Sequence, residues 1–221
     1  MKLQNSELFR EFDRLHKTFG DKNSKPIYGA GQITSPNLFF IFMNPTIKNV
    51  AASPEWRGIR APWLGTKNVW KLFYRIKILD KSFYSLTQKL TPSEWTPEFS
   101  YELYSQISKK SVYITNLAKC TQSNAKPIGG RVFKSHLTSI KDEITRVSPK
   151  KIITLGNLVS SLLLGKSVKI SNYEGKSENL ILDNEQFPIY PVYYPVGQGM
   201  RNLNKAVTNL KKIMVSSDRI N

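Results

Sequence analysis

Cysteine is nearly absent from this sequence of 221 residues, which contains Cys120 alone. A single thiol excludes an intramolecular disulfide and any metal site built entirely from cysteines. Histidine is almost as rare, since His16 and His136 are the two in the chain. No apolar run approaches the ~18 residues that a membrane-spanning helix needs, and the N-terminal segment has no signal-peptide core. We therefore expect a cytoplasmic protein, or a nuclear one in a eukaryote, without a membrane partner.

Acidic residues are scarce as well. The chain has 16 Asp and Glu against 33 Lys and Arg, which gives a formal net charge of +17. This surplus favours a polyanionic partner, with nucleic acid as the leading candidate, although selection for solubility would produce the same composition. The phosphate-binding patterns G-x-x-x-x-G-K-[ST] and G-x-G-x-x-G are also missing, which argues against a nucleotide-binding enzyme of another type.

Short apolar segments alternate along the chain with segments of helical periodicity. We predict strands over residues 38–42, 111–116, 151–156 and 189–195, the last after a hairpin-like polar segment. We predict helices over residues 5–19, 67–79, 96–109, 133–147, 157–165 and 201–217. This alternation predicts an α/β fold, with residues 1–221 in one domain: a three-layer α/β/α sandwich around a central, mostly parallel four-stranded sheet.

Two of the predicted helices carry more detailed signals. In the helix over 67–79, Trp70, Phe73 and either Ile76 or Ile78 should face inward. The helix over 96–109 should begin with Thr96 as its N-cap and with the following proline at its first helical position.

Polar or turn-forming residues follow three of the predicted strands. Asn44-Pro45 comes after the first strand, Asn116 ends the second, and the segment 194–197 follows the last. In parallel α/β sheets ligands bind beyond the carboxyl ends of the strands, so these residues lie where a site is expected. The alternative is that the asparagines only form turns.

The motifs around these strand ends resemble those of the uracil-DNA glycosylase superfamily, from about Tyr28 to the C-terminal helix. The Asn-Pro pair is similar to the first motif of the mismatch-specific and single-strand-selective branches. The other motifs are similar to those of the iron–sulfur branch. The matching segments, in chain order, are YGAGQITSPNLFFIF (28–42), FMNPT (42–46), WRGIRAPWLGT (56–66), SVYITNLAKC (111–120) and SPKKIITLG (148–156).

The sequence departs from the family pattern in three places. The iron–sulfur branch uses four cysteines, so with Cys120 alone we expect no cluster, no metal and no other cofactor. Phe42 and Thr46 stand where the first motif usually has glycines. Many members carry His-Pro-Ser in the last motif, whereas this chain has Tyr194 followed by Pro195 and Val196.

The resemblance implies roles for the residues at the predicted strand ends. Asn116 would read the edge of a flipped base, because one amide offers both a donor and an acceptor. Trp63 would stack on that base, and Met43 and Pro45 would line its pocket. Asn44 would position the attacking water through its amide oxygen. Each of three residues has a structural alternative: Asn116 could be a strand-end cap, Trp63 a core aromatic and Asn44 a turn residue.

The departing base would need a hydrogen-bond donor in place of the missing histidine. Tyr194 could donate with its hydroxyl, as could the backbone N–H groups of Val196 or Gly197. Tyr194 could equally be a core aromatic.

The resemblance also implies residues that contact DNA. The loop of Gly197, Gln198, Met200 and Arg201 would enter the minor groove, with Met200 or Arg201 filling the vacated stack. In the alternative, this segment only begins the last helix. Candidate phosphate contacts, any of which could instead belong to a solvated basic face, are Lys67, Lys119, Lys126, Arg131 and Lys134.

The sequence therefore predicts a monomeric, monofunctional DNA glycosylase that acts in base excision repair. It would flip uracil or a related deaminated base out of DNA and hydrolyse the N-glycosidic bond. Without the usual histidine the activity should be weak. The alternative is a glycosylase-like module that binds DNA without cleaving it.

Overall fold

The computed structural model describes residues 7–124 and 128–215. Its strands are β1 (Ala30–Gly31), β2 (Leu38–Phe42), β3 (Val112–Asn116), β4 (Ile152–Leu155), β5 (Glu178–Leu182) and β6 (Glu185–Val192). Its α-helices are α1 (Glu7–Phe19), α2 (Asn68–Arg75), α3 (Lys81–Lys89), α4 (Pro97–Lys109), α5 (Gly130–Ser135), α6 (Leu137–Val147), α7 (Asn157–Leu164) and α8 (Leu203–Val215). None of the helices in these two ranges is long and apolar enough to cross a membrane.

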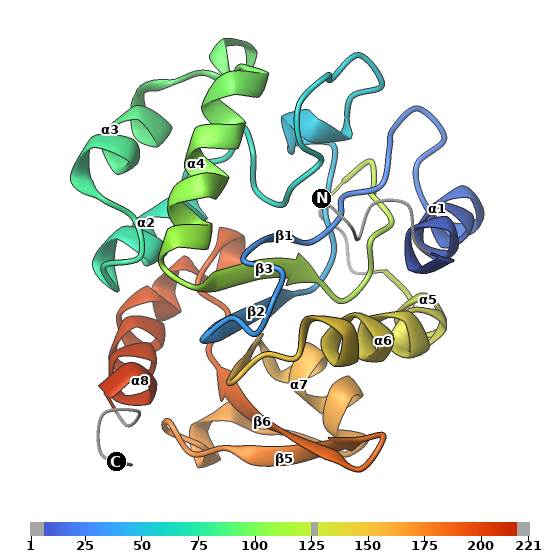
Figure 1. The fold of residues 1–221 in the computed structure, drawn as a ribbon, viewed down its shortest axis with the longest axis vertical. Helices are drawn as coiled ribbons and strands as arrows, with labels where there is room; N and C mark the ends of the chain where they lie inside the picture. Colours follow the sequence, from blue (N-terminus) through green and yellow to red (C-terminus); the bar gives the residue numbers. More distant parts are fainter. Residues whose placement is uncertain (1–6, 125–127, 216–221) are drawn as a thin grey trace.

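The strands form one sheet in the order β1-β3-β2-β4-β6-β5 (Figure 1). Its four inner strands are parallel and correspond to the four predicted ones, whereas β1 and β5 join antiparallel at the edges. The prediction of a four-stranded sheet was therefore wrong: the described part of the chain forms six strands. The last inner strand along the chain, β6, begins before the predicted 189–195 and ends earlier, at Val192. At two residues β1 is too short to show a period. The hairpin expected before the last strand is present as β5–β6, with Asp183 and Asn184 at positive φ in its two-residue turn.

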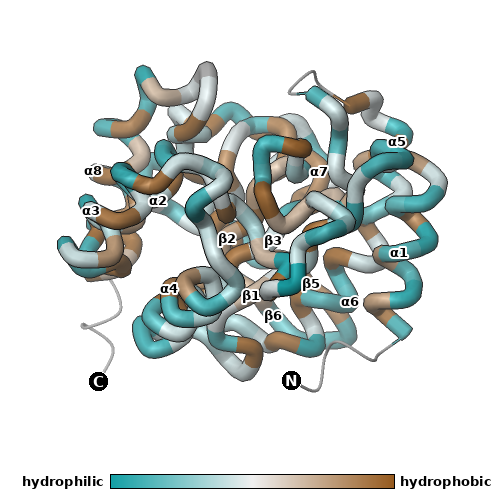
Figure 2. The backbone as a smooth tube through the Cα atoms, turned by 90° about the horizontal axis from the view of Figure 1, so that it is seen from above, coloured by the Kyte–Doolittle hydropathy of each residue, from teal (hydrophilic) through white to brown (hydrophobic). Residues whose placement is uncertain are grey.

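Both faces of the sheet are covered, which gives the predicted three layers. Alternate residues of β2 point into different cores: Phe40 packs with α2, α4 and α8, and Phe39 packs with α5, α6 and α7. Figure 1 shows these two sets of helices on opposite sides of the sheet, and Figure 2 shows hydrophobic segments in the interior between them. The continuous apolar run of β2 thus reflects burial on both faces.

The helix boundaries differ from the prediction in two places. The predicted helix 67–79 ends at Arg75, where Lys77 takes a positive φ, and α3 follows unpredicted. The predicted helix 133–147 divides at His136 into α5 and α6.

Other helix details agree with the prediction. The side chains expected to face inward from the helix at 67–79 are buried: Trp70, Phe73, Ile76 and Ile78. Helix α4 begins as predicted, with the Thr96 hydroxyl accepting a hydrogen bond from the Phe99 N–H (3.2 Å) and proline at the first helical position.

Candidate active site

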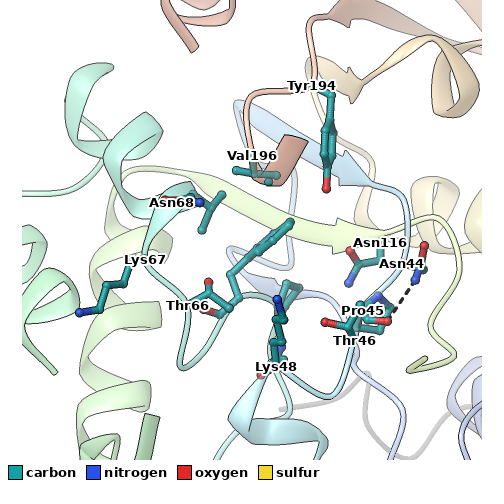
Figure 3. Close-up of a pocket in the computed structure, with 15 residues that line it drawn as sticks. Asn44, Pro45, Thr46, Lys48, Thr66, Lys67, Asn68, Asn116, Tyr194 and Val196 are labelled. Atoms are coloured by element: carbon teal, nitrogen blue, oxygen red, sulfur yellow. Dashed lines mark hydrogen bonds between the residues drawn. The ribbon is translucent and has the colours of Figure 1, made fainter. Parts of the chain in front are cut away.

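A cavity of about 240 Å³ opens at the carboxyl ends of the inner strands (Figure 3). Its walls come from the loop after β2, the segment that leads into α2, the end of β3 and the segment after β6. The lining residues are Asn44, Pro45, Thr46, Lys48, Asn49, Pro62, Trp63, Thr66, Lys67, Asn68, Val69, Asn116, Tyr194, Val196 and Gly197. Two of these residues are lysines, and this set, drawn from the described residues, contains no acidic side chain or histidine.

The loops after β2 and β3 run side by side because their backbones continue the pairing of the two strands. The N–H groups of Leu117 and Ala118 donate to the carbonyls of Phe42 (2.7 Å) and Met43 (2.9 Å). Further along, a parallel bridge joins Thr46 to Gln122. Since Phe42 also pairs with the last residue of β3 in the sheet register, both asparagines are held at the same edge of the pocket.

The two asparagines present their amides differently. The Asn44 Nδ2 donates to the Pro45 carbonyl (3.1 Å), which leaves Oδ1 as an acceptor for another group. Asn116 is only 2% exposed, yet among the described residues nothing bonds its side-chain amide. Its amide lines the pocket, so a ligand that offers both a donor and an acceptor could bond to it.

Trp63 lines the pocket from a tightly held loop. Its φ of +67° is in the left-handed region, where bulky side chains are rare. Each of the six consecutive carbonyls from Ile59 to Leu64 accepts a hydrogen bond. The donors, in order, are Trp56 Nε1, the Tyr28 N–H, Asn49 Nδ2, the Tyr104 hydroxyl, the Thr66 N–H and hydroxyl, and the Val50 N–H. These bonds fix the backbone that carries the indole ring, whose Nε1 is buried without a partner in the described structure.

Phe42, which stands where the first motif of the family usually has glycine, fits beside the pocket as part of its wall. Its fully buried ring packs edge-on against Trp63, with 4.8 Å between ring centroids, and lies 6.5 Å from the ring of Tyr194. A side chain in place of the usual glycine therefore supports both aromatic walls of the pocket.

Tyr194 points its ring into the pocket above Asn116 (Figure 3). Burial raises the pKa of its hydroxyl to about 12, so the group keeps its proton at neutral pH. The following turn packs closely on it: a Cβ on Gly199 would lie 2.2 Å from the Tyr194 carbonyl oxygen, so only glycine fits there.

Of the predicted site residues, eight line the pocket together: Asn44, Pro45, Trp63, Lys67, Asn116, Tyr194, Val196 and Gly197. Met43 and Met200 lie outside this set, and each packs against one of the two hydrophobic cores. Residues 197–202, which include Gln198 and Arg201, form a 3₁₀ helix that leads into α8, so the segment does begin the last helix. Arg201 is exposed there, as are Arg131 and Lys134 on α5. Lys126 lies outside the described residues.

The prediction that Lys119 contacts DNA phosphates is wrong. Its side chain is fully buried, and its Nζ donates to a carboxylate oxygen of Glu143 (2.5 Å), the Thr115 hydroxyl (2.6 Å) and the backbone carbonyl of Asn116 (2.5 Å). Burial lowers the pKa of Lys119, and the charge of Glu143 opposes that shift. Lys119 is therefore an internal support of the loop after β3.

Lys48 and Asn68 also line the pocket, and neither is among the residues predicted from the sequence. Lys48 belongs to the loop that begins with Asn44-Pro45, and this position within the motif is the signal that could have identified it. Asn68 starts α2, close to the predicted Lys67.

The described residues do not provide a metal centre. No cluster of three or more His, Cys, Asp or Glu side chains occurs in them. Cys120 is buried, and burial raises the pKa of its thiol to about 11. An iron–sulfur cluster bound by cysteines does not fit this chain, because the other three thiols are missing.

Comparison with known proteins identifies a family. The model described as "Uracil DNA glycosylase superfamily" matches residues 31–214, a range that contains every residue lining the pocket. A search of curated proteins gave no match.

Proposed function

Because the chain belongs to the uracil DNA glycosylase superfamily, we propose that it is a monofunctional glycosylase that removes uracil or a related deaminated base from DNA. Membership of this superfamily suggests a DNA glycosylase; the substrate and the residue roles are our proposal. The observation that carries it is the amide of Asn116, which lines one pocket with Asn44, Trp63 and Tyr194 and has no hydrogen-bond partner among the described residues.

Base recognition would begin with extrusion of the nucleotide from the helix, because the glycosidic bond is inaccessible inside a duplex. Trp63 offers the base a ring to stack on, which is worth ~1–3 kcal/mol. The Asn116 amide can then accept from N3–H of uracil and donate to O4. Cytosine has the opposite donor and acceptor pattern along this edge, so one amide held in this orientation distinguishes the two bases.

Hydrolysis breaks the C1′–N1 bond and leaves its electron pair on the base. Water then bonds to C1′ and releases a proton to solvent, the anionic base takes up a proton, and the products are the neutral base and an abasic sugar. Asn44 has an unpaired Oδ1 that can orient this water, but an amide is too weak a base to remove the proton. The protonated Tyr194 hydroxyl can donate to the O2 atom of the departing base.

A second candidate function is a module that binds extruded or damaged nucleotides without cleaving them. The composition of the pocket favours it, since none of the described lining residues is a carboxylate or a histidine that could act as a general base. Tyr194 and Thr46, which replace family residues, favour it as well.

Incubation with oligonucleotides that contain one uracil separates the two candidates. Alkali cleaves the strand where a base has been lost, so a glycosylase gives a cleaved product; hypoxanthine, xanthine and mismatched thymine substrates should be run in parallel. We expect uracil to be excised, Asn44→Ala to be slower than wild type, and Asn44→Asp to be faster because a carboxylate also stabilises the sugar cation. If no variant, including Asn44→Asp, releases any base, the binding module replaces the glycosylase.

A further inference from the structure

Lys48 places an ammonium group at the pocket that the functions discussed so far do not use. It follows Asn44-Pro45 on the loop after β2, is exposed, and lines the same cavity as Asn116 and Tyr194. In Figure 3 Lys48 lies below the space between Thr66 and Asn116. The next residue anchors this loop, because Asn49 accepts from the Ala51 N–H (3.0 Å) and donates to the Ala61 carbonyl (2.9 Å).

The charge of the pocket is unusual for a site that forms a sugar cation. A carboxylate beside C1′ would stabilise that cation, but the described lining residues carry two lysines and no acid. Positive charge opposes formation of a cation and favours formation of an anion. The group that becomes an anion in this reaction is the base, which takes both electrons of the broken C1′–N1 bond.

The side chain of the second lysine, Lys67, points in a different direction from that of Lys48. It stands at the start of α2 and is exposed, and in Figure 3 its side chain extends away from Asn116 and Tyr194. This geometry suits a phosphate outside the pocket, and it makes Lys67 a matched comparison for Lys48: the same residue type, on the same cavity, with the opposite orientation.

We propose that Lys48 is a further catalytic residue, whose ammonium stabilises the base as it departs as an anion. The inference rests on the proposed glycosylase function and deepens it, because it says which substrates suit the pocket: bases that leave readily as anions or already carry negative charge. In this scheme Lys48 stabilises the departing base, Asn44 orients the water, and Asn116 recognises which base is bound.

Binding of free bases tests this without any need for catalysis. Barbiturate is a uracil ring that is already an anion at neutral pH, whereas uracil is neutral. By titration calorimetry, wild type should bind barbiturate more tightly than uracil, and Lys48→Gln should lower that preference about tenfold, as expected for one partly solvated charge at close range. Lys48→Arg should keep the preference, and Lys67→Gln, whose side chain lines the same cavity but points away from Asn116, should lower it less than Lys48→Gln does. A preference for barbiturate that is the same in Lys48→Gln and wild type would overturn the proposal.

Excision rates provide a second test of the role of Lys48. In single-turnover assays Lys48→Gln should slow release of uracil by about tenfold or more and slow 5-fluorouracil less, because fluorine already stabilises the departing anion. An equal loss for both bases, or a loss confined to DNA affinity, would make Lys48 a phosphate contact instead. If wild type excises neither base but binds barbiturate through Lys48, the glycosylase function fails while the anion-binding role stands.

Discussion

The ammonium of Lys119 lies 2.5 Å from the backbone carbonyl oxygen of Asn116 and donates a hydrogen bond to it. The same Nζ pairs with Glu143 of α6, whose carboxylate also accepts from the Tyr113 hydroxyl (2.8 Å). The end of β3 is therefore tied to a helix on the far side of the sheet from Trp63. In the proposed function this connection would position the base-reading side chain from behind.

Removal of Lys119 should destabilise the protein strongly. Lys119→Met leaves the Glu143 carboxylate buried without its cation, and losing one partner of a buried pair costs about 3–5 kcal/mol. Urea unfolding of wild type and variant measures this directly. The double variant Lys119→Met with Glu143→Leu removes both charges and should recover much of the loss. Equal stability of wild type and Lys119→Met would contradict the structural role.

Asn116→Ala should abolish excision of uracil and leave the affinity for DNA nearly unchanged. Phosphate contacts provide most of that affinity, whereas one amide that reads a base edge adds little. Single-turnover excision and fluorescence anisotropy measure the two quantities separately. The fold should not suffer, because the amide has no partner in the described structure. Wild-type excision by Asn116→Ala would rule out the reading role.

Tyr194→Phe should slow excision by up to about 10²–10³, the usual cost of losing a donor to developing negative charge. Because burial raises the pKa of Tyr194 to about 12, the hydroxyl remains a donor at ordinary pH and should impose no fall in rate between about pH 7 and 10. Tyr194→His should preserve or raise activity and add a pH dependence near 6.5. If Tyr194→Phe matches wild type, the N–H groups of Val196 and Gly197 become the remaining donors.

Binding to DNA should weaken steeply with salt, because a chain of net charge +17 releases counterions when it neutralises phosphates. With about 4–6 phosphate contacts the log–log slope should lie roughly between −3.5 and −5.5. Anisotropy titrations at several salt concentrations give this slope. Lys67→Gln should reduce the magnitude of this slope by about 0.9, the contribution of one phosphate contact. A flat series would exclude nucleic acid as the main partner.

Tyr104→Phe should loosen the pocket wall from a distance. Its hydroxyl, fully buried on α4, donates to the Pro62 carbonyl (2.6 Å) next to Trp63. Loss of this bond leaves a buried acceptor unsatisfied and should cost about 1–3 kcal/mol. Hydrogen exchange should quicken at the amides of Val50 and Thr66, which bond the neighbouring carbonyls. Unchanged exchange at both amides would show that the other bonds hold the loop without Tyr104.

The sequence could predict the inner strands and the residues at their ends, because a run of five apolar residues such as 38–42 fits a strand buried on both faces. It could not predict β1, which is too short for periodicity and exists through its pairing with β3. Nor could it predict the burial of Lys119. Lysine is normally exposed, and its partner Glu143 lies 24 residues further along the chain. Both failures concern contacts that depend on tertiary structure.

The six bonded carbonyls from Ile59 to Leu64 have a consequence for how a base would arrive. A loop held at every residue already has its final shape, so capture involves no closing motion of this wall. In the proposed function the DNA would therefore supply the motion, and the rate of capture would depend on how often the target base leaves its stack unaided. Such a rigid pocket would favour bases in single strands or unstable mispairs, which open most easily.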